Sequence, residues 1–206
     1  MTIAITEEHR TLAETVADFL AKREARAANR ALLDAPDDSL PSFWPEMAAN
    51  GWLGLHIAEE FGGSGYGLEE LVIVVEQLGR VVAPGPFVPT LIAGAVLAEA
   101  AGADLAARYL PGLADGSRVG AYAFCTDVSL DGDRLSGTAV VPGGAQAQVI
   151  VVPVGDDVAV VEVGEGVSVD VPKSLDPARP SAKVTFDGAA AAVVPGGARA
   201  AVDLAR

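Results

Sequence analysis

The spacing of apolar residues changes once along this chain, and that change constrains the fold more than any other feature. Before about residue 111, apolar residues recur every three or four positions, as on one face of a helix. After about residue 119 they alternate with polar residues or form short valine-rich blocks between turn sequences such as Asp-Gly and Pro-Gly-Gly. The pattern predicts an α+β fold, with an all-helical first region followed by a small β-barrel or sandwich.

Five helices are predicted in the first region. The first follows Thr6, an N-cap residue, and the second begins at Pro41 and ends at Gly51, which favours a left-handed cap. A third helix presents Leu71, Val72, Val75 and Leu78 on one apolar face. The last three helices are expected at residues 68–80, 88–101 and 103–110, and Pro111 is expected to stop the final one.

The second region is predicted to consist of short strands. These are expected at residues 119–126, 133–141, 148–154, 158–163, 167–171 and 182–186. A turn after Val194 and the opening of another helix are expected at the end of the chain. The predicted domains are therefore a helical domain at residues 1–116, a β domain at 117–194 and the start of a further, truncated helical domain at 195–206.

Charge and composition exclude several classes of protein. The 206 residues include 28 acidic and 14 basic side chains, and the net charge of −14 repels polyanions, so nucleic-acid binding is not expected. The only cysteine, Cys125, has no partner for an internal disulfide, which suits a reducing, cytoplasmic location; a buried, inert thiol is expected. Pro84, Pro86 and Pro89 interrupt the uncharged run at residues 81–98, so membrane insertion is not expected either.

Several conspicuous side chains have simple structural interpretations. The glycine-rich residues 61–67 lack the Lys-Ser/Thr pair of a P-loop and follow no predicted strand. Glu59 and Glu60 are adjacent and point in different directions, which favours solvated acids over an acid–base pair. His9 and His56 have no other ligand-type residue at metal-binding spacing, so no metal site is predicted.

Three motifs follow one another between residues 44 and 86: WPEMAANGWLGL, EEFGGSGYG, and EQLGR with PGP after it. Their order resembles the amino-terminal helical domain of acyl-CoA dehydrogenases, and the strand region resembles the middle β domain of that family. The resemblance implies FAD-dependent α,β-dehydrogenation of an acyl-CoA thioester, in which a carboxylate removes the α-proton and the flavin accepts the β-hydride.

Members of this family have a second helical domain, which supplies the glutamate base. The present chain resembles only the first two domains. No catalytic residue is therefore assigned, and the chain is expected to be a fragment or to work with a partner. The resemblance also implies a homo- or hetero-oligomer, such as one half of a fused or heteromeric enzyme of the actinobacterial type.

The resemblance places Phe124, Thr126, Val141 and Gly143 at flavin-binding positions of the middle domain. Thr126 takes the place of a threonine that hydrogen-bonds to the flavin ring, and the glycine-serine-aspartate loop that normally follows is missing. Val141 stands where the family has an aromatic residue, and Gly143 where it has a threonine facing the flavin. Binding of FAD by this chain is therefore expected to be weakened or lost.

Three functional hypotheses remain open at the level of sequence. The first is participation in FAD-dependent acyl-CoA dehydrogenation, and the second is a non-catalytic structural subunit that pairs with a catalytic partner. The third is a flavin monooxygenase or oxidase, because the same architecture serves more than one reaction. The sequence also leaves open whether the acyl group is a fatty chain or a bulky ring system.

Overall fold

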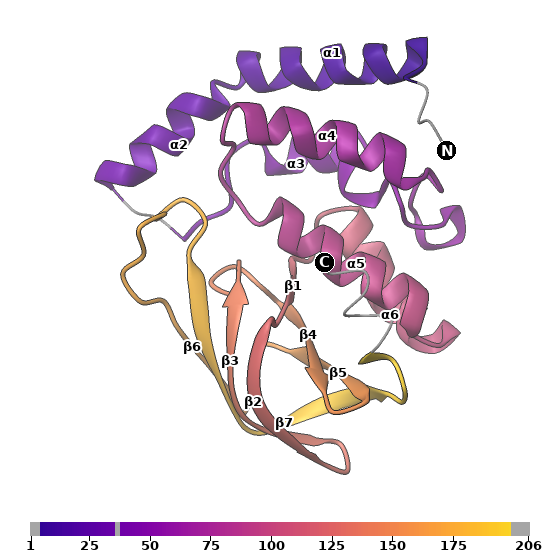
Figure 1. Ribbon diagram of the computed structural model, residues 1–206, viewed down its shortest axis with the longest axis vertical. Helices are drawn as coiled ribbons and strands as arrows, with labels where there is room; N and C mark the ends of the chain where they lie inside the picture. The colour runs from indigo at the N-terminus through magenta and orange to yellow at the C-terminus, as the bar shows by residue number, and fades with distance from the viewer. Residues whose placement is uncertain (1–4, 36–37, 199–206) are drawn as a thin grey trace.

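The computed structural model describes residues 5–35 and 38–198, and it contains a helical region followed by a curled sheet (Figure 1). The longer helices are α1 (Glu7–Lys22), α2 (Ala25–Asp34), α3 (Trp44–Ala49), α4 (Leu68–Arg80), α5 (Phe87–Ala100) and α6 (Ala103–Ala114). Two short 3-10 turns, η1 (Trp52–Gly54) and η2 (Glu59–Phe61), connect α3 to α4.

The second region is a mixed sheet that curls into a half-barrel. Its strands are β1 (Gly120–Tyr122), β2 (Cys125–Asp131), β3 (Arg134–Pro142), β4 (Val149–Val154), β5 (Asp157–Glu162), β6 (Val167–Asp170) and β7 (Ser181–Val194). They follow the order β1-β4-β5-β7-β3-β2, with β6 also paired to β7. Only the β1–β4 pair is parallel among the described strands. This arrangement confirms the predicted α+β fold class.

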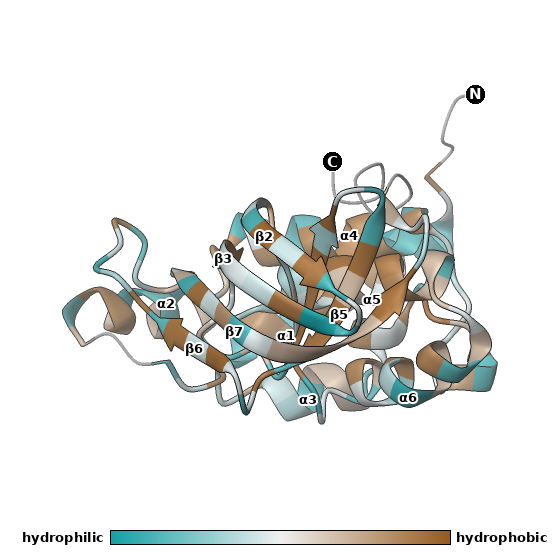
Figure 2. Ribbon diagram, turned by 90° about the horizontal axis from the view of Figure 1, so that it is seen from below, coloured by the Kyte–Doolittle hydropathy of each residue, from teal (hydrophilic) through white to brown (hydrophobic). Residues whose placement is uncertain are grey.

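The helical region and the sheet share a hydrophobic core. Residues of α5 and α6 such as Val96 and Leu110 pack with Tyr122 and Val160 of the sheet, and all four are buried. The helix α5 can pack against both the sheet and the other helices, because it is apolar nearly all round and Glu99 is its only charged residue (Figure 2). Within the helical region, α1, α3 and α4 enclose a second core, and the inside of the curled sheet holds a third.

The ends of several helices follow from local chemistry. At the start of α1 the Thr6 side chain accepts from the His9 amide while the His9 ring accepts from the Thr6 amide, which is a reciprocal capping box. After α3, Gly51 adopts a φ of +74°, as predicted for a left-handed cap. The α3 helix begins at Trp44 rather than Pro41. The α2 helix was not predicted; it is short and rich in alanine, and it fully buries only Ala25.

Two predictions about the helices are wrong. The α6 helix continues past Pro111 to Ala114, because Leu110 and Leu113 are fully buried on either side of the proline and this packing outweighs the lost hydrogen bond. On α4 the expected core residue Val72 is 61% exposed, and Val74 is buried instead, since the inward face of the helix follows the contacts with α1.

Two predictions about the strands are also wrong. The expected strand at 119–126 is two strands, because the chain leaves β4 after Tyr122 and pairs with β3 from Cys125 onward. The expected strand at 182–186 extends from Ser181 to Val194, and its alanine-rich half pairs with β5. Alanine has low strand propensity, so only the tertiary pairing reveals this extension. The helix expected after Val194 falls mainly on residues 199–206, outside the described residues.

Candidate functional site

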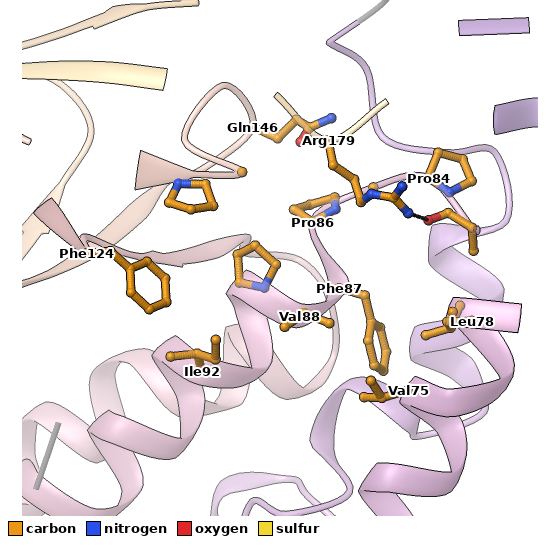
Figure 3. Close-up of a pocket in the computed structure, with 16 residues that line it drawn as sticks. Val75, Leu78, Pro84, Pro86, Phe87, Val88, Ile92, Phe124, Gln146 and Arg179 are labelled. Atoms are coloured by element: carbon orange, nitrogen blue, oxygen red, sulfur yellow. Dashed lines mark hydrogen bonds between the residues drawn. The ribbon is translucent and has the colours of Figure 1, made fainter. Parts of the chain in front are cut away.

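An apolar pocket of about 330 Å³ lies where the two regions meet. The end of α4 contributes Val75 and Leu78, and the start of α5 contributes Phe87, Val88 and Ile92 (Figure 3). The opposite side is formed by residues of the sheet region. Of the α5 side chains that line this cavity, Phe87 is buried, whereas Ile92 is partly exposed and Val88 is 44% exposed. The pocket therefore offers an apolar surface that is not covered by the described protein.

The walls of this pocket are built to hold their shape. Pro84, Pro86, Pro89 and Pro142 all line it, and each proline fixes its own φ angle. The turn between α4 and α5 is held by backbone hydrogen bonds, including that from the Ala83 amide to the Leu78 carbonyl at 2.9 Å. The amide of Thr90 likewise donates to the Pro86 carbonyl at 3.0 Å and closes the first turn of α5.

Polar side chains at the pocket are engaged with other protein groups. The Arg179 guanidinium donates from Nε and Nη2 to Asp176 Oδ2, at 3.1 and 2.8 Å. Its Nη1 donates to the Ala83 carbonyl at 3.2 Å and so ties the β6–β7 loop to the helical region (Figure 3). Gln146 Nε2 donates to the Ser39 carbonyl at 3.3 Å. These hydrogen bonds join the helical region to the sheet region beside an apolar cavity.

Two of the four residues predicted to contact flavin line this pocket. Phe124 is 49% exposed, and its ring meets the ring of Tyr122 edge-on, with 5.0 Å between centroids. Gly143 has a φ of +70°, and a Cβ atom there would lie 3.0 Å from Pro89 Cγ. A larger residue at position 143 would therefore be strained and crowded against the start of α5. Flavin contact at these two positions stays a prediction.

The other two predicted residues lie elsewhere. Thr126 is exposed on β2, and its hydroxyl donates to the Pro153 carbonyl at 3.3 Å. Val141 is fully buried in the core of the sheet. Flavin contact at Thr126 and Val141 stays a prediction. Successive residues of a strand point to opposite faces, so Val140, which is 45% exposed, faces outward in its place.

The glycine-rich loop is internally bonded. The amides of Gly63 and Ser64 donate to the carbonyls of Ala58 and Gly54, at 3.2 and 3.0 Å, and the amide of Gly65 donates to Ile57 at 2.9 Å. A Cβ atom on Gly63 would lie 2.0 Å from the Ile57 carbonyl oxygen, so glycine is required there for close packing. These amides are not available to cradle a phosphate.

The other residues that stand out in the sequence do not form a further site in the described part of the chain. Glu59 and Glu60 are exposed. Both ring nitrogens of His56 are buried without a hydrogen-bond partner, and burial lowers the pKa of this histidine while the backbone of Leu91 opposes part of the effect. In the described part of the chain, no three metal-binding side chains come together. No helix there is long and apolar enough to cross a membrane. The side chain of Cys125 lies outside the described part.

Sequence reasoning missed the pocket itself. Val88 and Ile92 line it, yet neither was singled out from the sequence. One signal was present for both, because α5 is apolar on its outward face as well as its inward face. The sequence resemblance places Arg179 in a turn with Asp176, but it gives no signal for the contact with Ala83, 96 positions away in sequence.

Comparison with known proteins agrees with this architecture. The family model for the amino-terminal domain of acyl-CoA dehydrogenases matches residues 6–117, more than half of the chain. The acyl-CoA dehydrogenase IpdE2 of Mycobacterium tuberculosis is 38% identical over 128 residues, which cover 62% of this chain and 40% of that protein. The chain thus spans about two fifths of the length of this relative.

Solved structures extend the similarity to the sheet. A variant of the Tcur3481-Tcur3483 steroid ACAD is 29% identical and has a TM-score of 0.84, covering 98% of this chain and 61% of its own. The ChsE4-ChsE5 complex from Mycobacterium tuberculosis has a TM-score of 0.82 at 23% identity, covering 99% and 61%, and shows the shared fold. On the strength of the family match and these relatives, the chain belongs to the acyl-CoA dehydrogenases, a family of oxidoreductases that use FAD.

Proposed function

We propose that this chain forms the acyl-binding part of an acyl-CoA dehydrogenase, an enzyme that removes two hydrogens from the α and β carbons of an acyl-CoA thioester. The observation that carries the proposal is the preformed apolar pocket of about 330 Å³ at the junction of the two regions. Its volume lies at the lower end of the range for small-molecule pockets, roughly 300–1,000 Å³. Family membership supplies the reaction class, and the pocket supplies a place for the apolar end of the substrate.

The described residues would act on the substrate by burial and orientation. Removing the acyl group from water against Val88 and Ile92 contributes about 25 cal/mol for each Å² of apolar surface. Because the proline-lined walls are fixed, a bound acyl group would hold its thioester in a restricted position. Such positioning is a contribution to catalysis that needs no titratable side chain in the pocket.

The described residues do not fit FAD in the way that the family motifs require. The Thr126 hydroxyl already donates to Pro153, and the Gly143 amide donates to the Pro180 carbonyl at 3.2 Å. The β2–β3 hairpin carries Asp131, Asp133 and Arg134, with Arg134 Nε 3.8 Å from Asp133 Oδ1, so its net charge is negative and opposes a diphosphate. We therefore derive no flavin step from these residues and propose that other residues or another chain supply the flavin site and the base.

A second candidate is a non-catalytic half that pairs with a catalytic partner. The engaged hydroxyl of Thr126 and the buried Val141 favour it, because both remove contacts that a flavin would use. The ChsE4-ChsE5 structure is a complex of two chains, which supports a hetero-oligomer here, although a homo-oligomer is also consistent with the proposal. We place either assembly in the cytoplasm, as the family membership and the single cysteine favour.

The acyl-binding proposal is tested by comparing octanoyl-CoA with free CoA in calorimetric titrations of the chain. We expect octanoyl-CoA to bind about tenfold more tightly than CoA, because only the thioester places apolar surface in the pocket. Val88→Asp should abolish this preference. Val88 lies in the first turn of α5, where a carboxylate favours the helix, so the variant should fold.

Val72→Asp is the matched control, because Val72 is an exposed valine on α4 that does not line the pocket. It should retain the preference for octanoyl-CoA. Equal binding of CoA and octanoyl-CoA by the parent chain would contradict the proposal, and so would a preference that survives Val88→Asp.

A further inference from the structure

We propose that the pocket selects a rigid, apolar ring group over a flexible straight chain, and that Phe124 is the residue that determines this choice. The inference rests on the proposed function of the pocket as an acyl site and names the class of acyl group. It is carried by three properties of the described pocket, namely its stiffness, its size and the flat aromatic side chain in its wall (Figure 3).

The stiffness of the wall favours a rigid ligand. Besides the four prolines, the α4–α5 turn contains Val82 at a φ of +55° and Gly85 at +104°. A β-branched residue holds a positive φ only where its surroundings enforce it. Arg179 fixes the same turn from the sheet side through its bond to the Ala83 carbonyl. A wall of this kind does not reshape around many chain conformers, so a flexible acyl chain must be ordered on binding whereas a ring system is already ordered.

The size of the cavity is appropriate to a compact ring system. A protein cavity of about 150 Å³ accommodates one benzene ring. The pocket here is about twice that volume, at about 330 Å³. A ligand of about two fused rings would therefore fill it, following the same ratio of volume to ring. Filling matters because every gap forfeits dispersion contacts that close packing would provide.

Phe124 provides a flat wall whose orientation is fixed. Its ring packs against the buried Tyr122 at an interplanar angle of 76°, so the ring has a partner on one side while about half of its surface stays uncovered. The aliphatic side chains of Val88 and Ile92 from α5 line the same pocket (Figure 3). A ring placed between an aromatic and an aliphatic wall gains contact over both faces, which a narrow chain does not.

The ring group should be apolar at the depth of the pocket. Prolines supply no N–H donors, and the donor nitrogens of Arg179 and Gln146 each already donate a hydrogen bond to Asp176, Ala83 or Ser39. A hydroxyl or amide on the buried part of a ligand would lose its bonds to water and find few groups to replace them, which is unfavourable. The selected group is therefore hydrocarbon in character, with any polar substituent toward the rim.

Two thioesters of equal carbon number test the inference: decahydronaphthalene-2-carbonyl-CoA and undecanoyl-CoA, each titrated into the 206-residue chain by calorimetry. We expect the bicyclic thioester to bind about tenfold more tightly. Phe124→Ala should weaken binding of the bicyclic thioester about fivefold and that of undecanoyl-CoA less than about twofold. Phe124→Leu, which keeps apolar bulk without a flat face, should shift the ratio in the same direction by a smaller factor.

Leu68→Ala is the matched control, since Leu68 is 63% exposed on α4 and outside the pocket; neither affinity should change. Because Phe124 is half exposed, its truncation leaves the buried core intact. Undecanoyl-CoA binding as tightly as the bicyclic thioester, with both tighter than CoA, would overturn the ring selectivity alone. Equal losses for both thioesters in Phe124→Ala would overturn the role of Phe124. If neither thioester binds more tightly than CoA, the proposed function fails and the inference fails with it.

Discussion

The helical and β regions differ in what they share with the acyl-CoA dehydrogenase family. The helical region has the family motifs in order, falls within the matched residues 6–117, and supplies one complete side of the pocket. The β region shares the backbone, as the TM-score of 0.84 over 98% of the chain indicates. At the positions expected to contact flavin, however, Thr126 is bonded internally and Val141 is buried.

The comparison separates the requirements of a fold from those of a site. The sheet depends on many buried apolar residues, and substitutions among them that conserve volume are tolerated. A cofactor site depends on a few exposed polar groups at fixed positions, each of which is lost by a single change. A β region can therefore retain its architecture in full while the polar groups of a cofactor site change.

The largest expected effect concerns the affinity of the chain for FAD, and it tests the difference between the two regions directly. We predict that the purified chain binds FAD orders of magnitude more weakly than a family member with intact flavin motifs. Each missing charge-assisted hydrogen bond removes about 1.5–3 kcal/mol. The measurement is flavin absorbance after gel filtration of the chain with excess FAD. A stoichiometric yellow complex would show that the β region does hold the cofactor.

The second largest effect is a difference in the free energy of unfolding between substitutions on the two faces of β3. Val141→Asp places an unpaired charge in the core of the sheet and should lower the free energy of unfolding by roughly 4 kcal/mol or more. Val140→Asp changes the exposed neighbour and should alter it by no more than about 1 kcal/mol. Urea denaturation of both variants measures the difference. Similar losses in the two would mean that the register of β3, and with it the placement of Val141, is wrong.

In the helical region, His56 should make stability depend on pH. Burial lowers its pKa in the folded state, so the unfolded chain binds the proton more readily. Stability is then fully present above the ordinary histidine pKa, near 6.5, and falls as the pH decreases below it, by at most about 1.4 kcal/mol per pH unit. Denaturation between pH 7 and pH 5 should show this loss. His56→Gln should reduce it, and an undiminished loss in this variant would contradict the prediction.

The smallest effect concerns a contact between the two regions. Glu162 on β5 accepts from Arg108 on α6 at 2.9 Å and from Arg118 at 3.4 Å. Burial acts to raise the pKa of Glu162, but the two arginines together outweigh it and the pKa is lowered. The side chains are substantially exposed, so Glu162→Gln should lower stability by only about 0.5 kcal/mol, and less in high salt. Urea titrations at low and high salt measure this; a loss of several kcal/mol would indicate a buried link instead.

The order of the two regions, the α+β class and the family could all be predicted from the sequence. Helices with strong local signals, such as α1 after Thr6 and α4 at Leu68–Arg80, were predictable because capping residues and apolar period act over a few neighbouring positions. The cap at Gly51 was predictable for the same reason, since a left-handed backbone requires glycine in most contexts.

Features that depend on contacts between distant segments can be seen only in the tertiary structure. There, α6 continues past Pro111, β7 extends through its alanines, and Val141 is buried while Val140 is exposed. Strand register and helix continuation depend on packing partners far away in the chain, which no local pattern encodes. The pocket is the strongest example, because its walls come from α4, α5 and the sheet region, and its shape exists only once these segments have packed together.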